Sequence, residues 1–152
     1  MHYLSVVKVL PHVMRNINEF NIPTGDTHGY EILYFGVNMI LMFDYRLSFD
    51  IEVIKNSDQG SNKIEVLIIS RKDVPAWKKG NRSGSNTDIK FHYSNSGERI
   101  NDVFKPSVSD AYAFILNNKT SSVGNNSKTK TVEVTLIHAW QQEIKESQLK
   151  DM

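Results

Sequence analysis

The chain contains no cysteine. That absence excludes a disulfide scaffold, a thiol nucleophile, Cys-ligated zinc and iron–sulfur clusters. The chain also has no large excess of charge of either sign, because 18 Lys and Arg balance 17 Asp and Glu for a formal net charge of +1. Without a basic excess the chain has no electrostatic footprint for nucleic acid, so we expect no general nucleic-acid binder.

Long apolar runs are absent too. The most apolar stretch, residues 34–43, is ten residues long and has Asn38 inside it, well short of the roughly 20 residues that span a bilayer. The first residues carry His2, Lys8 and His12 and do not follow the pattern of a signal peptide. We therefore expect no membrane-spanning segment in this chain.

Catalytic and metal-binding motifs are missing as well. The sequence has no G-x-S-x-G, H-E-x-x-H, P-loop, dinucleotide-binding or EF-hand pattern. Its five histidines form no H-x-H or i, i+4 pair, so no metal site and no cofactor are predicted; they are His2, His12, His28, His92 and His138. These absences favour a protein that is not an enzyme.

One carboxylate pair remains as a candidate for chemistry. Asp50 and Glu52 project from the same face of a predicted strand, about 7 Å apart. A small sugar-processing hydrolase would need these carboxylates to converge with His28 or His138 in one pocket. Solvated charge on a strand face is the simpler interpretation.

The feature present throughout is period-two alternation. Residues 45–53 and 132–140 alternate apolar and polar side chains, which predicts strands with one wet face. Three runs are apolar on both faces, as central strands are: residues 30–35, 64–69 and 111–116. Weaker strand candidates are residues 3–9, 14–22, 38–43, 89–93 and 99–104.

Turn-forming residues separate these runs. The chain has 14 Asn and 15 Ser, and turn clusters fall at residues 23–26, 55–60, 81–86 and 94–97. Residues 117–130 have almost no apolar content and predict a long hairpin loop between the last two strong strands. Residues 140–152 place Trp140, Ile144 and Leu149 near helical spacing, which indicates a short helix or a fraying tail.

About eight to ten short strands without intervening helices predict an all-β fold. We expect an antiparallel β-sandwich or jelly roll, with a closed barrel as the nearest alternative. No break in composition divides the chain, so residues 1–152 form a single predicted domain, with a core of about 13–140 and a tail at 141–152.

The segment 71–82 is the sharpest local feature, with five basic residues and one acid around Trp77. In one interpretation it is an exposed loop that binds an anionic or glycan ligand: Trp77 stacks on the ligand, and Lys78, Lys79 and Arg82 contact its charge. In the other, which we favour, Trp77 turns inward to close the end of the sandwich and the lysines are solvated.

Three N-x-[ST] sequons begin at Asn81, Asn118 and Asn125, all in predicted loops. A glycosylation acceptor must be accessible in this way. The sequons are compatible with an exported surface protein, and they favour an extracytoplasmic or secreted location over a cytoplasmic one.

Three blocks of sequence resemble GOLD-like (Golgi-dynamics type) β-sandwich domains. They are residues 20–25 with the strands at 30 and 45–53; residues 64–69 with Val74 and 77–80; and residues 110–118 followed by 130–136, which is similar to the family's final hairpin. The likeness spans roughly residues 17–140. It implies a compact, non-catalytic interaction module. Trafficking adaptors of that family generally carry a disulfide, so the missing cysteines point to a stand-alone relative.

The first functional hypothesis is accordingly a β-sandwich module that binds a protein or glycan partner through its loops or an exposed sheet face. The second is a structural subunit of a surface layer, capsid or appendage, for which a homo-oligomer is expected. The third is the small hydrolase.

Overall fold

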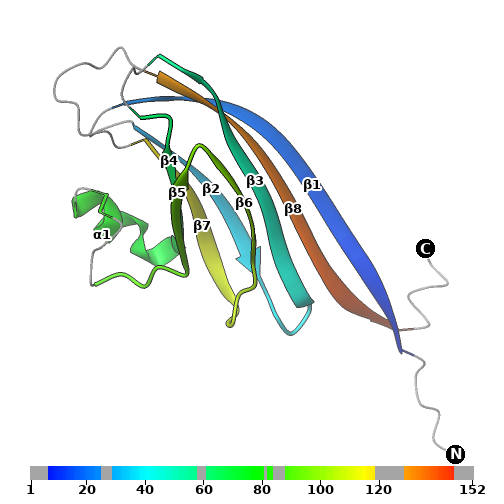
Figure 1. Ribbon diagram of the computed structural model, residues 1–152. Coiled ribbons are helices and arrows are strands. Elements are labelled where there is room, and N and C mark those ends of the chain that lie inside the picture. The colour runs from blue at the N-terminus through cyan, green and yellow to red at the C-terminus, as the bar shows by residue number, and fades with distance from the viewer. Residues whose placement is uncertain are drawn as a thin grey trace, which may run out of the picture.

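The computed structural model describes residues 7–24, 29–57, 61–80, 82–83, 88–118 and 129–145 (Figure 1). Over these residues the strands are β1 (Val7–Pro23), β2 (Tyr30–Val37), β3 (Phe43–Asn56), β4 (Ile64–Ser70), β5 (Tyr93–Gly97), β6 (Arg99–Phe104), β7 (Asp110–Asn117) and β8 (Thr129–Lys145). A 3-10 turn, Arg71–Asp73, leads into one short helix, α1 (Val74–Lys79). The predicted all-β sandwich is confirmed.

The strands form two antiparallel sheets of four. We call β1-β8-β3-β6 the long sheet and β2-β7-β4-β5 the short sheet. Strand pairs join the chain from its ends inward: β1 with β8, β2 with β7, β3 with β6, and β4 with β5. These four strand pairs assemble into two sheets through two further pairings. In the long sheet β8 also pairs with β3, and in the short sheet β7 also pairs with β4. This is the topology of an eight-stranded jelly roll.

The alternation in β3 shows how the sequence builds the long sheet. Leu47, Phe49 and Ile51 are buried while the residues between them are more exposed. In the register of the sheet they lie beside Leu136 and Val134 of β8, so the two strands present one apolar face to the short sheet. That face and the facing side chains of the short sheet make the main core.

The short sheet is covered on both faces. Its two central strands, β4 and β7, are buried along almost their whole length, as the apolar runs at 64–69 and 111–116 predict. The third such run, 30–35, was also expected to be central, but it lies in the edge strand β2 and is only partly buried.

A second core lies on the outer side of the short sheet, where α1 packs (Figure 1). Trp77 of α1 is 0% exposed and meets Leu67, Ile69 and Ile115 in this cluster. Tyr30 contributes its ring at 84° to the indole, with 5.6 Å between ring centroids. None of the described helices is long and apolar enough to cross a membrane.

Several weaker expectations are wrong in detail. Residues 38–42 form a turn rather than a strand, because Leu41 and Met42 both donate their amides to the Asn38 carbonyl. Residues 94–97, expected to be a turn, belong to β5. Residues 7–9 of the candidate 3–9 and the candidate 14–22 belong to the single strand β1, whose edge position tolerates Pro11 because proline cannot donate to a ladder. Residues 3–6 lie outside the described part of the chain.

The C-terminal expectation is wrong for residues 140–145. Instead of starting a helix, Trp140 continues β8, which pairs with β1 as far as Lys145. The expected hairpin between the last two strands is also absent, because β7 lies in the short sheet and β8 in the long sheet. A connection between sheets therefore replaces it; residues 119–128 lie outside the described part of the chain.

We expect Trp77→Ala to lower the free energy of unfolding by about 3–5 kcal/mol, because it leaves a large cavity between α1 and the short sheet. The measurement is urea denaturation followed by far-UV circular dichroism. Lys79→Ala is the matched control on the exposed side of the same helix, and we expect a change within about 0.5 kcal/mol. Equal losses in the two variants would contradict the inward placement of Trp77.

Candidate functional site: the outer face of the long sheet

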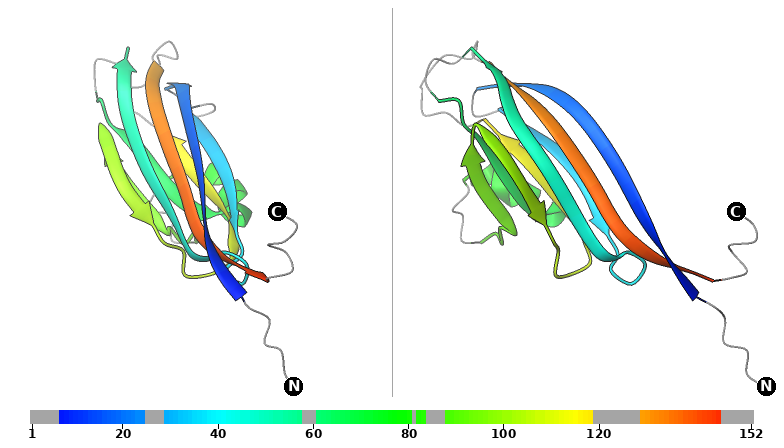
Figure 2. Two further views of the ribbon diagram at one scale, coloured as in Figure 1. Left: turned by 90° about the vertical axis from the view of Figure 1, so that its right-hand side faces the viewer. Right: turned by 45° about the vertical axis from the view of Figure 1, so that its right-hand side comes forward.

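One broad face of the sandwich has no covering layer in the described chain. It is the outer face of the long sheet, meaning the side of β1, β8, β3 and β6 that points away from the short sheet. Figure 2 looks toward this face in its left-hand view, where β3, β8 and β1 run side by side at the front. The corresponding face of the short sheet is covered by α1. Among the described residues, the outer face is therefore a regular surface that is left open to a partner.

Strand register places the side chains of this face in rows that cross the sheet. One row joins Val13, Ala139 and Arg46, and the next joins Arg15, Ile137, Ser48 and Val103. The following rows are Ile17, Thr135, Asp50 and Asn101, then Glu19, Glu133, Glu52 and Arg99. Because side chains alternate between the two sides of a strand, all of these project outward.

Exposed apolar side chains lie on the two edge strands of this face. Val13 and Ile17 of β1 and Val103 of β6 have 67%, 59% and 46% of their surface accessible. Ile137 of β8 is half-buried, and Ser48 of β3 lies between it and Val103. Exposed apolar side chains on a face that also carries charge are found at interaction surfaces.

An acidic row crosses one end of the face. Glu133 lies directly opposite Glu19 on one side and opposite Glu52 on the other. Like charges directly opposite one another destabilise a sheet, since their Cβ atoms are only about 4.5–5.5 Å apart. At the β6 end of the row, Arg99 donates two hydrogen bonds to Asp50, at 3.2 and 3.0 Å, and this bonding raises the pKa of Arg99. Arg99 also lies directly opposite Glu52, whose charge contributes to the raised pKa of Arg99, whereas the register places no Lys or Arg opposite Glu19 or Glu133.

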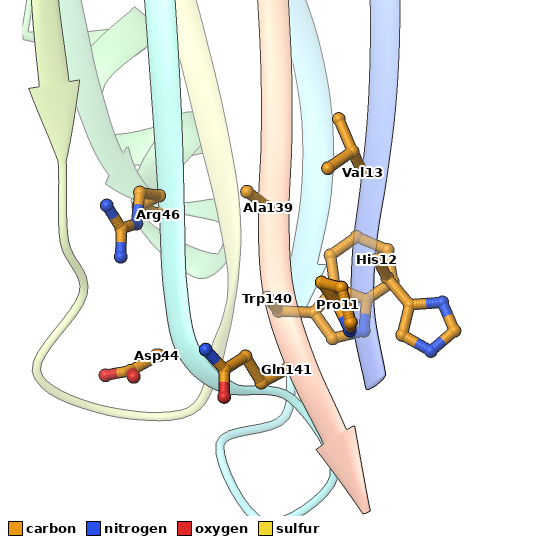
Figure 3. Close-up of a pocket in the computed structure, with 8 residues that line it drawn as sticks. All are labelled: Pro11, His12, Val13, Asp44, Arg46, Ala139, Trp140 and Gln141. Carbon is orange, nitrogen blue, oxygen red and sulfur yellow. The ribbon is translucent and has the colours of Figure 1, made fainter. Parts of the chain in front are cut away.

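The opposite end of the face is hollowed and carries arginine. A hollow of about 210 Å³ opens where Ala139 presents only a methyl group between Val13 and Arg46. Figure 3 shows the residues that line it, from β1, β3 and β8. Asp44, at the same end, has a φ of 54° in the irregular stretch between Phe43 and Arg46. Aspartate tolerates that left-handed conformation better than most residues, which lets β3 bulge there.

Sequence reasoning found only part of this surface. The alternation at 45–53 identified the wet side of β3, including Asp50 and Glu52. The alignment of Glu19 with Glu133 was not found, because it depends on the pairing of the first strand with the last. Acidic residues at matching positions of the alternating strands were the available signal, but register cannot be read from one sequence.

The structure does not support the ligand-binding interpretation of the basic segment around Trp77. Trp77 is in the second core, so it has no face to offer a ligand, and the inward orientation that we favoured is the observed one. Arg82 is 3% exposed, with its guanidinium 5.3 Å from the centroid of the Tyr30 ring. Lys78 also lies over Tyr30, and Lys79 is exposed. A four-residue binding loop is therefore wrong, because two of its members are buried.

The sequons do not share one environment. Asn118 is 1% exposed and donates from Nδ2 to the Ile22 carbonyl at 2.8 Å, while its amide donates to the Gly29 carbonyl at 2.7 Å. Its side-chain nitrogen, which would carry a glycan, is already engaged in the interior. Asn118 is therefore wrong as a glycosylation candidate. Asn81 and Asn125 lie outside the described residues.

The residues proposed for a hydrolase do not converge. Asp50 and Glu52 are on the outer face, whereas His138 projects to the inner side of the same sheet. His28 and His2 lie outside the described residues. A site combining the carboxylates with His138 is thus excluded by the two sides of the sheet.

His138 is a core histidine with a polar partner. The Tyr45 hydroxyl and His138 Nδ1 are hydrogen-bonded, and Phe35 packs against the imidazole with 5.7 Å between ring centroids. Burial lowers the pKa of His138 and raises the pKa of Tyr45, so both groups are neutral near pH 7.

Two further arrangements were candidates for chemistry. Ser70 donates directly to Asp110, and this hydrogen bond lowers the pKa of the Asp110 carboxyl. A nucleophilic triad would instead place a histidine between serine and carboxylate. Within the described ranges, no three His, Asp or Glu side chains gather in a way that could hold a metal ion.

Comparison with known proteins adds no family assignment: no family model and no curated protein sequence matches this chain.

His138 makes folding stability depend on pH. Its folded pKa lies below the ordinary value of 6.5, so the unfolded chain binds the proton more tightly. Stability is complete above about pH 6.5 and falls as the pH drops below it. We expect the loss of melting temperature from about pH 7.5 to about pH 5 to be smaller in His138→Gln, whose amide oxygen can still accept from Tyr45. Identical pH profiles for the two proteins would contradict this assignment.

The burial of Asn118 predicts that its sequon stays unmodified. When the protein is produced through a eukaryotic secretory pathway, intact-mass spectrometry of the folded protein should show the same glycan mass for wild type and Thr120→Ala, which removes this sequon without altering Asn118. A glycan found at Asn118 of the folded protein would overturn the placement of its side chain.

Proposed function

We propose that the protein is a non-catalytic jelly-roll interaction module that binds a protein partner through the outer face of its long sheet. The observation that carries the proposal is the set of exposed apolar side chains, Val13 and Ile17 on β1 and Val103 on β6, on a regular face that no described element covers. Single exposed apolar residues are ordinary, but several on one open sheet face together with charge favour a docking surface.

A protein partner is favoured over a glycan because of where the aromatic side chains lie. Sugar-binding surfaces use exposed aromatic rings as stacking platforms, and the rows of the outer face contain none. Trp77 is fully buried, and Trp140 stacks on His12 with 5.4 Å between ring centroids. The outer face instead offers apolar side chains with charged rows at both ends, which matches the apolar centre and polar rim of protein interfaces.

The second candidate is a structural subunit of a surface layer, capsid or appendage. The pairing of strands from the chain ends inward favours it, because jelly rolls of this topology are building blocks of viral capsids. This is an analogy of fold, and the same fold also serves lectin domains. Kinship with GOLD-like domains and an extracytoplasmic location remain predictions from the sequence.

Site-specific photo-crosslinking tests the proposed module. A benzoyl-phenylalanine residue is introduced at Thr135 in the centre of the outer face, or at Asn101 on β6, in cells that produce the full chain. We expect protein adducts from both positions, since both side chains project from the docking surface.

The matched control places the same crosslinker at Lys79, which is exposed on α1 at the far side of the molecule. Adducts should be absent or different there. The proposal fails if Thr135 and Asn101 give no protein adduct, or if a glycan array detects binding that survives Ile17→Arg on the outer face.

A further inference from the structure

The outer face is complementary in charge to itself. Its acidic row, formed by Glu19, Glu133 and Glu52, lies at one end, and the arginines Arg15 and Arg46 lie toward the other. A partner that satisfies both ends must carry the same two signs in the reverse order along the strands. A second copy of this chain, turned by a two-fold rotation, presents that order.

We propose that two copies of the chain dimerise face to face through their long sheets. This inference rests on the proposed function and names its partner. The two-fold axis lies across the strands, over the row that joins Asn16, Leu136 and Phe49, which are aligned with one another in the sheet. Such a dimer is isologous, so every contact occurs twice.

The register about this axis pairs opposite charges. On β3, Arg46 and Glu52 are each three residues from Phe49, so Arg46 of one copy faces Glu52 of the other. On β8, Glu133 and Ala139 are each three residues from Leu136, which sets Glu133 over the hollow at Ala139, beside Arg46. Glu133, which has no Lys or Arg directly opposite it in its own sheet, thereby gains a neighbouring cation from the other copy.

The two rows on either side of the axis meet at the centre of the same arrangement. Ile137 faces Thr135 on β8, while on β1 the stem of Arg15 faces Ile17. Arginine stems cover apolar surface while their guanidinium groups reach outward, here toward Glu19 of the other copy. Two sheets packed in this way lie about 10 Å apart with their strands within about 30° of alignment.

The size of the contact predicts a weak dimer. Four strands at about 4.8 Å and six residue steps at about 3.4 Å outline about 400 Å² on each copy. Stable interfaces bury about 1,200–2,000 Å² in total. We therefore expect association that depends on protein concentration and that weakens as salt screens the charged rows.

Charge reversal tests the axis directly. Sedimentation velocity over a concentration series should show the wild-type chain moving from monomer to dimer. Arg46→Glu should raise the dissociation constant at least about tenfold, because it sets two acids against each other twice per dimer. Glu52→Arg should do the same, and the double variant Arg46→Glu with Glu52→Arg should recover the wild-type value.

The control is Lys79→Glu, which changes the net charge equally but lies on α1; it should leave the dissociation constant unchanged. Melting temperatures establish that each variant is folded. A wild-type chain that stays monomeric at high concentration overturns the dimer, and so does a dimer that ignores both reversals. If the dimer fails but Thr135 still gives adducts with other proteins, the docking face is still supported. If Thr135 gives no protein adduct either, the docking face and the dimer are both wrong.

Discussion

The pairing of the first strand with the last is the constraint on which the rest of the structure depends. β1 and β8 align over seventeen residues, from Val7 with Lys145 to Pro23 with Thr129. β8 also pairs with β3 and so holds the centre of the long sheet. Closing so long a segment of chain costs conformational entropy that only extensive pairing and core burial can offset. Loss of the β1–β8 ladder would leave β8 as an edge strand and uncover Ile22 and Phe20, which β1 contributes to the main core.

The outer sides of the two sheets differ in whether another element covers them. The short sheet has a second core on its outer side, and α1 covers it. Trp77 is buried in this core and is not part of an exposed ligand-binding loop. The long sheet keeps charge on its outer side and gains no cover among the described residues. That asymmetry explains why the most basic segment of the sequence is structural, while the proposed docking surface lies on strands whose local sequence is unremarkable in charge.

The sequence predicts what depends on local pattern. Alternation at 45–53 and 132–140 located β3 and the start of β8, and apolar runs located β4 and β7. It fails where pairing overrides local preference: Trp140 has helical spacing to Ile144 but continues β8 because β1 lies beside it. The helix α1 had its own signal, Pro75 in the first turn and Gly80 after the last residue, which the surrounding basic charge obscured.

The acidic row is informative because an isolated chain gains nothing from it. Two like-charged pairs, Glu19 with Glu133 and Glu133 with Glu52, each oppose strand pairing. A basic partner would relieve these glutamates but would set its own charge against Arg15 and Arg46. An apolar partner would bury charges without neutralising them, which costs more still. A surface that carries both signs in reversed order would bring cations to Glu19 and Glu133, and the chain's own outer face carries both signs.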